Sequence, residues 1–301
     1  MDFDYFLSLF VSGMTRGSIY ALLALGYTMV YGIIKLINFA HGEVYMIGAF
    51  TALIVASVLA MTATPIFAIF VIATLIAALF SVGYGFTMEK IAYKPLRQSP
   101  RLSALISAVG MSFFLQNYVL LVQTSNFLPF PRLIPKIATL ERSSLVSTSQ
   151  VVIFGTTAIV MVLLWFLIKH TKVGKSMRAT SQDRIMAQLV GININRVISY
   201  TFVIGSATAA LGGVLISSHI GQINYYIGFV AGIKAFVAAV LGGIGSIPGA
   251  VLGSFVLGWT ESFGTGYISS DYEDVFAFVF LLLILIFRPE GILGRSTKQK
   301  V

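Results

Sequence analysis

The chain has 301 residues, of which 57% are hydrophobic and only 10% are charged, and its mean hydropathy is +0.91. Soluble domains are about 25% charged, so this composition excludes a soluble enzyme, a soluble nucleic-acid binder and a disordered chain. The net charge of +9 would suggest nucleic-acid binding in a soluble protein. In a membrane protein it is expected, because cytoplasmic loops collect Lys and Arg. Since the chain has no cysteine, disulfides and thiolate metal sites are also excluded.

We therefore predict an all-α, polytopic integral membrane protein whose residues 1–301 form a single transmembrane domain. A spanning helix needs about 20 mostly apolar residues. The apolar segments, in chain order, are 8–34, 44–61, 65–88, 103–123, 150–168, 198–217, 229–244, 248–263 and 275–288. We expect eight to ten transmembrane helices, including short or broken ones.

The N-terminal part of the chain allows two predictions. Counted from Tyr5, the first segment would be about 45 Å long as one helix, which favours two pieces with a break before Arg16. The start, Met1-Asp2-Phe3-Asp4, is acidic where a signal peptide is basic, so we expect no cleaved signal.

The positions of the basic residues predict the orientation. Fifteen of the twenty fall in loops that would share one side of the membrane: Lys35, Lys90, Lys94, Arg97, Arg101, Lys169, Lys172, Lys175, Arg178, Arg184, Arg196, Arg288, Arg295, Lys298 and Lys300. By the positive-inside rule this side is cytoplasmic. The tail 289–301 and the C-terminus are then cytoplasmic, and the proline-rich segment 124–149 is a loop on the periplasmic side, packed on the protein or capping a pore.

Two polar or glycine-rich stretches interrupt the apolar pattern near the cytoplasmic side. The first contains Asn38, His41, Gly42 and Glu43, and the second contains Gly242, Gly243, Gly245 and Pro248. Irregular backbone at membrane depth is tolerated where it is buried in protein or lines a water-filled cavity. Interrupted segments in both halves of a transporter indicate the translocation path. We predict that these eight residues line or gate such a path; the alternative is that the glycines only allow close helix packing.

Two of the polar residues in the first stretch have simpler interpretations. Glu43 could stabilise the start of the next helix through its dipole. His41 is better interpreted as a hydrogen-bonding residue than as a metal ligand, because no second histidine or carboxylate cluster accompanies it. We predict no metal site.

Lys234 and Glu261 are the ionisable residues that lie most clearly inside apolar segments. Such groups are costly in a membrane and are usually paired or exposed to water. We predict an ion pair between neighbouring helices. Lys234 could instead extend to the outer surface, and a proton relay is a third interpretation.

The predicted cytoplasmic loop 170–197 contains a short amphipathic helix. Thr180 and Asp183 match a capping box, Ile185 and Leu189 fall on one face, and Gly191 fits the left-handed position after a helix. Together with Arg184 and Ala187, they suggest a helix that docks in a partner's groove or lies on lipid headgroups.

Binding of nucleotide by this chain is excluded on motif grounds. Gly174-Lys175-Ser176 resembles part of a phosphate-binding loop, but position 169, where the motif needs a glycine, is lysine. Any ATP and Mg²⁺ must therefore be used by separate subunits, and we predict no cofactor in this chain.

Several long blocks resemble the LivH-type permeases of bacterial branched-chain amino acid ABC importers. They are MVYGIIKLINFAHGEVYMIGAF at 29–50, SALISAVGMSFFLQNY at 103–118, INYYIGFVAGIKAFVAAVLGGIGSIPGA at 223–250 and RPEGILGR at 288–295. The resemblance covers nearly the whole chain and is weakest at 124–149. It implies a multi-pass protein of the bacterial inner membrane.

The resemblance also implies partners. These are a second homologous permease, two cytoplasmic ATPase subunits and a periplasmic amino-acid-binding protein. The family's Ala-x-x-x-Gly coupling element falls on Ala187 and Gly191, although the acidic residue typical of this element in other ABC importers is replaced by Ile185. The function implied is ATP-driven import of Leu, Ile and Val, without enzymatic activity in this chain. The alternatives are an ion-coupled secondary transporter and a related permease for urea, amides or other amino acids.

Overall fold

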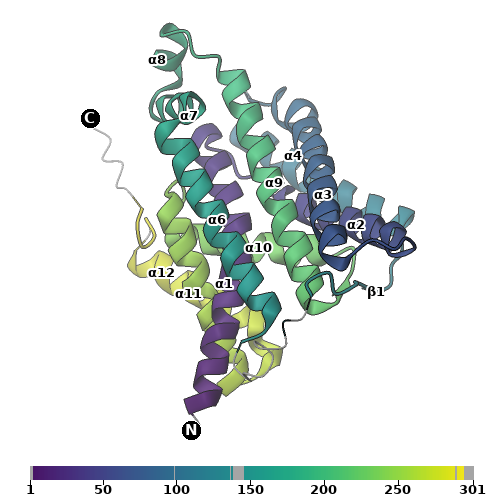
Figure 1. Cartoon of the computed structure of the whole chain (residues 1–301). Coiled ribbons are helices and arrows are strands. Elements are labelled where there is room, and N and C mark those ends of the chain that lie inside the picture. Colours follow the sequence, from purple (N-terminus) through teal and green to yellow (C-terminus); the bar gives the residue numbers. More distant parts are fainter. Residues whose placement is uncertain (1–2, 98, 136, 138–145, 289, 295–301) are drawn as a thin grey trace.

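The computed structural model describes residues 3–97, 99–135, 137, 146–288 and 290–294. Its helices are α1 (Phe3–Ile34), α2 (His41–Ala60), α3 (Ile66–Met88), η1 (Glu89–Tyr93), α4 (Arg101–Val122), α6 (Thr148–His170), α7 (Lys172–Gln182), α8 (Arg184–Leu189), α9 (Ile194–Ile220), α10 (Ile227–Gly242), α11 (Ile247–Tyr267), η2 (Ser270–Tyr272) and α12 (Glu273–Phe287) (Figure 1). Two short strands, β1 (Leu128–Pro129) and β2 (Gln222–Ile223), pair antiparallel.

The predicted all-α membrane fold is confirmed. Within the described residues, six helices are long and apolar enough to cross a membrane: α1, α2, α3 with η1, α4, α6 and α9. We also expected short or broken helices, and these are the last three, α10, α11 and α12. α10 and α11 form a pair bent by 118°, and α12 has 15 residues, about 22 Å at 1.5 Å per residue.

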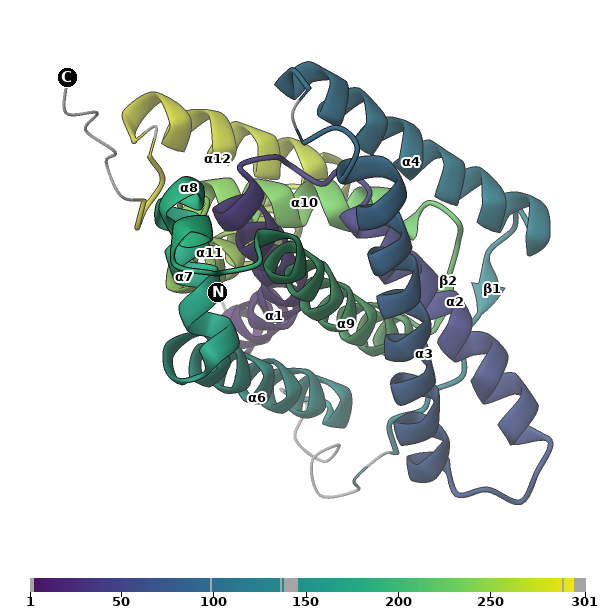
Figure 2. The ribbon, with the colours of Figure 1, turned by 90° about the horizontal axis from the view of Figure 1, so that it is seen from above.

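The first helix is not divided. α1 runs without a break for 32 residues, so the break that we expected before Arg16 is wrong. Seen along the bundle, α1 lies in the middle, between α6, α9, α10 and α11 (Figure 2). Protein rather than lipid surrounds most of its length, and bilayer thickness therefore does not limit it.

Close contact between α1 and α11 depends on small residues. Gly13 and Gly17 are one helical turn apart and face Gly258: a Cβ on Gly258 would overlap the carbonyl oxygen of Gly13 and would lie 2.8 Å from the Cα of Gly17. Membrane helices associate through such surfaces because no hydrophobic effect drives apolar helices together in lipid.

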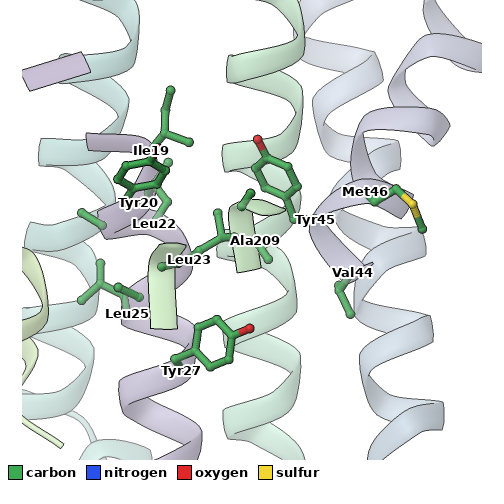
Figure 3. Packing of buried hydrophobic residues seen from close by; sticks show 14 of the residues in the cluster. Ile19, Tyr20, Leu22, Leu23, Leu25, Tyr27, Val44, Tyr45, Met46 and Ala209 are labelled. Atoms are coloured by element: carbon green, nitrogen blue, oxygen red, sulfur yellow. The ribbon is translucent and has the colours of Figure 1, made fainter. Parts of the chain in front are cut away.

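The core lies where α1, α2 and α9 meet. Leu23, Tyr45 and Ala209 converge there and are almost completely buried (Figure 3). The outer helices instead expose large apolar side chains, such as Leu79 on α3 and Ile159 on α6. A bundle with a packed centre and an apolar outer surface is suited to lipid.

The two ends of the bundle differ. At one end, here called the basic end, Arg184 donates to the carbonyl of Ile33 at the end of α1 (2.7 Å), and Arg97 bonds to Asn195. The helices α7 and α8 lie there, whereas α1 begins at the opposite end (Figure 1). The basic loops after α1, η1 and α6 thus share one end, as the sequence predicted.

The predicted loop 124–149 packs on the protein over its described part. β1 pairs with β2, the amide of Phe130 donates to the carbonyl of Gly221 (2.9 Å), and the amide of Leu133 donates to the hydroxyl of Ser218 (3.1 Å). Residues 136 and 138–145 of this loop, and 289 and 295–301 of the predicted tail, lie outside the described residues.

Candidate functional site

The first interrupted stretch turns back into the bundle. α1 ends at Ile34, Lys35 adopts a left-handed φ of 59°, and α2 starts at a buried His41. The ring of His41 lies 4.9 Å from that of Tyr27, and a Cβ on Gly26 would overlap its imidazole. Because Gly26 precedes the end of α1 by eight residues, about 12 Å, α2 begins deep inside the protein.

Glu43 is held by side chains of α4. Its carboxylate is fully buried and accepts hydrogen bonds from Ser112 and Gln116, both at 2.8 Å. Glu43 lies in the first turn of α2, as expected. Its hydrogen bonds also connect α2 to α4.

The second interrupted stretch is a sharp turn between α10 and α11. Gly243 has a φ of +102°, a conformation that side chains rarely adopt. Ser246 caps α11 by accepting from the amide of Gly249 (3.2 Å), and Pro248 occupies the first turn. The carbonyl of Gly242 accepts from the amide of Leu293 (2.9 Å), so the chain after α12 satisfies part of the turn.

The two interrupted stretches lie along different parts of α10. Gly42 packs on Gly228 and Gly232 near the start of α10. Gly242 lies ten residues after Gly232, about 15 Å along the same helix. The rest of the first stretch runs along α10 towards the second: the ring of Phe39 lies 5.6 Å from that of Phe236, and Ile37 and Ile244 line one small pocket.

The structure places Lys234 beside Glu261, within a larger charge cluster. Lys234 Nζ lies 3.3 Å from the carboxylate of the fully buried Glu261, 2.6 Å from that of Glu273 and 2.9 Å from that of Asp274. Arg16 contacts Glu273 at 2.9 Å. Because the Lys234 side chain is only 9% exposed, it does not extend to the surface.

The predicted docking helix is shorter than expected. Thr180 lies inside α7 and donates to the carbonyl of Ser176 (2.8 Å), so the predicted capping box with Thr180 is wrong. Asp183 caps α8 alone, accepting from the amides of Ile185 (2.8 Å) and Met186 (3.1 Å). The left-handed conformation predicted for Gly191 is confirmed, with a φ of +84°.

The two sides of α8 differ in burial. Ala187 is buried against the protein, whereas Ile185 and Leu189 are 70% and 74% exposed, and Met186 and Val190 are exposed beside them. A six-residue helix held at the end of the bundle thus presents an apolar surface outward.

Comparison with known proteins gives the family. Residues 9–285 match the family model described as the permease component of the branched-chain amino acid transport system. The chain is 48% identical to the high-affinity branched-chain amino acid permease LivH of Salmonella typhimurium and to that of Escherichia coli, over 100% of this chain and 99% of each relative. It is 49% identical to BraD of Pseudomonas aeruginosa, over 99% of this chain and 98% of the relative.

The chain belongs to the branched-chain amino acid permease family. It is a transport permease, as predicted.

Sequence reasoning missed most of the charge cluster in this permease. Arg16 lies within the first predicted segment, Glu273 and Asp274 lie just before the last, and Tyr20, which donates to Glu261 at 2.6 Å, carries no signal in the sequence. A useful clue was the acidic start of α12, which falls on the same side of the predicted topology as Arg16. The partners of Glu43 on α4 were missed in the same way.

We expect the variant Lys234→Met to destabilise the permease. Removing one partner of a buried ion pair leaves an uncompensated charge and costs about 3–5 kcal/mol. Here Arg16, 3.7 Å from Glu261, offsets part of that loss, so the lower end of the range is expected. Thermal unfolding of the purified permease in nanodiscs measures the effect. Adding Glu261→Gln should restore part of the stability; a double variant as unstable as the sum of both singles would contradict the pairing.

Proposed function

We propose that this permease is the transmembrane subunit of an ATP-driven importer of leucine, isoleucine and valine. The observation that carries the proposal is the match over the full length of the chain, at 48–49% identity, to permeases named for high-affinity transport of branched-chain amino acids. The apolar interior fits this cargo, since few charges line the bundle outside the cluster at Lys234.

The proposed location is the bacterial inner membrane, with the basic end in the cytoplasm. The support is the positive-inside rule together with the gathering of the basic loops at one end of the bundle. The C-terminal tail and α8 then face the cytoplasm, and β1 and β2 face the periplasm.

The proposed partners are a second homologous permease, two cytoplasmic ATPases that use ATP and Mg²⁺, and a periplasmic amino-acid-binding protein. Support for the ATPase contact comes from α8, whose exposed apolar side chains suit a groove on another protein. Arg184 is bonded to the end of α1, so α8 is connected directly to the centre of the bundle. Asp183 caps the start of α8 and Gly191 follows its end, and in this proposal Ile185 and Leu189 make the contact.

The proposed gate is formed by the two interrupted stretches. Asn38 Nδ2, His41 Nε2 and Glu43 Oε2 are buried without a hydrogen-bond partner among the described residues. Such groups each cost about 1–3 kcal/mol when they are left unpaired. Their succession along 38–43 supports a hydrated path at this point, and the bent turn at Gly242, Gly243, Gly245 and Pro248 supplies the second movable element.

Transport in proteoliposomes tests the function. With the permease pair, the ATPases and the binding protein reconstituted, we expect uptake of radiolabelled leucine that requires ATP and proceeds without an ion gradient. Omitting the ATPases is the control. Uptake driven by a proton or sodium gradient alone would instead support a secondary transporter, although Glu261, its candidate coupling acid, is paired with Lys234. Competition by urea or amides, with no competition by isoleucine or valine, would identify a different cargo.

A further inference from the structure

A cavity of about 440 Å³ lies beside the charge cluster, towards the end of the bundle where α1 begins. Its volume is within the range of about 300–1,000 Å³ typical of small-molecule sites. One face each of α1, α9 and α10 forms most of the wall, with residues spaced three or four apart. Among them are Arg16 from α1, Ile216 from α9, and Ile227, Val230, Ala231 and Lys234 from α10.

The wall is divided by polarity. Isoleucine and valine side chains from α9 and α10 form an apolar part, while Arg16, Lys234 and Glu273 bring both signs of charge to the other part. The side chains of Arg16 and Glu273 are 34% and 30% exposed, so both reach the space beside their 2.9 Å ion pair. Adjacent positive, negative and apolar surfaces match the three groups of an aliphatic amino acid.

We propose that this cavity is a binding site of the permease for a zwitterionic, branched aliphatic amino acid. This inference rests on the proposed function, because the cargo class is taken from it. The amino acid's carboxylate binds Arg16, its ammonium group binds Glu273, and its side chain lies against Ile216, Ile227 and Val230.

The amino acid can bind in this way without breaking the ion pairs of the cluster. Both ion-pair contacts of Arg16 use Nη1, and a guanidinium has five N–H donors, so others remain for a ligand carboxylate. The cluster contains two cations, Arg16 and Lys234, against the carboxylates of Glu261, Glu273 and Asp274. The ammonium group of a zwitterion finds a carboxylate partner there, and because the zwitterion has no net charge, its binding leaves the charge balance of the cluster unchanged.

Photolabelling tests the site directly. The complete importer in proteoliposomes would be irradiated with a leucine analogue that carries a diazirine in its side chain, and the permease would be analysed by peptide mass spectrometry. We expect adducts within 216–220 or 227–234 that excess leucine suppresses. Adducts confined to other segments would overturn the site while leaving leucine import intact. A failure of radiolabelled leucine uptake in the same vesicles would instead contradict the proposed function.

A cavity-filling variant gives a second test. Ala231→Leu adds bulk to the cavity wall, and Ala158→Leu adds the same bulk to the exposed surface of α6. We expect Ala231→Leu to lower adduct yield and leucine uptake at least about tenfold relative to Ala158→Leu. The larger side chain occupies space in the cavity that the amino acid needs. Co-purification of the ATPases shows that the variant is assembled. Equal uptake and labelling by the two variants would overturn the proposal, and if Ala231→Leu does not assemble, the labelling of the unmodified importer decides.

Discussion

Replacing Gly42 with alanine is expected to abolish transport. Gly42 faces the backbone of α10: its new Cβ would overlap the carbonyl oxygen of Gly228 and would lie 2.8 Å from the Cα of Gly232. Backbone atoms cannot rotate away as side chains do, so α2 and α10 must separate. Overpacking of this kind costs about 1–3 kcal/mol, and it acts where α2 enters the bundle beside the proposed gate. Leucine uptake and thermal unfolding in nanodiscs measure the two effects.

Gly155→Ala is the matched control. Gly155 lies in the interior of α6, where an added Cβ meets nothing within 4 Å. Alanine favours a helix by about 1 kcal/mol over glycine, so this variant should keep or gain stability. If Gly42→Ala transports leucine as well as Gly155→Ala does, the close crossing of α2 and α10 is not required for function.

The double variant Ile185→Asp with Leu189→Asp is expected to release the ATPases. Both side chains are exposed on α8 and, in the proposed complex, become buried in a groove of the ATPase. Burying an aliphatic side chain contributes about 1.5–3 kcal/mol, so losing two weakens association by about 100-fold or more. Co-purification of the ATPases with the tagged permease is the measurement.

Ile137→Asp with Ile268→Asp controls for added charge. Both residues are exposed and lie outside the membrane-spanning helices and outside α8. This control should retain the ATPases, and both double variants should insert into the membrane in normal amounts. Normal co-purification with the α8 variant would show that the ATPases bind another surface.

The sequence predicted the features that depend on local composition. Each apolar segment contains a helix, and the two interruptions occur where glycine, proline or polar residues cluster. Gly191 and Gly243 both have the left-handed φ values that favour glycine.

Features that depend on tertiary packing were not predictable in the same way. Asp183 caps α8, but the hydroxyl of Thr180 donates a hydrogen bond within α7. The sequence did not predict α7, because residues 172–182 contain few apolar side chains. Arg16 meets Glu273 only because α1 and α12 pack beside α11, and no local pattern links positions so far apart in the chain. The cavity forms between faces of α1, α9 and α10, and the sequence alone does not show which face of each helix points towards the others.

The unbroken first helix has a mechanical consequence. Its carbonyl at Ile33 is held by Arg184 at the foot of α8, and its Arg16 forms part of the cavity wall, 17 residues or about 26 Å away. A continuous helix is stiff along its axis, so any shift of α8 that α1 follows is delivered to the far wall without a hinge to absorb it. α1 would thus transmit movement along its axis between the proposed ATPase-binding end and the proposed amino acid site.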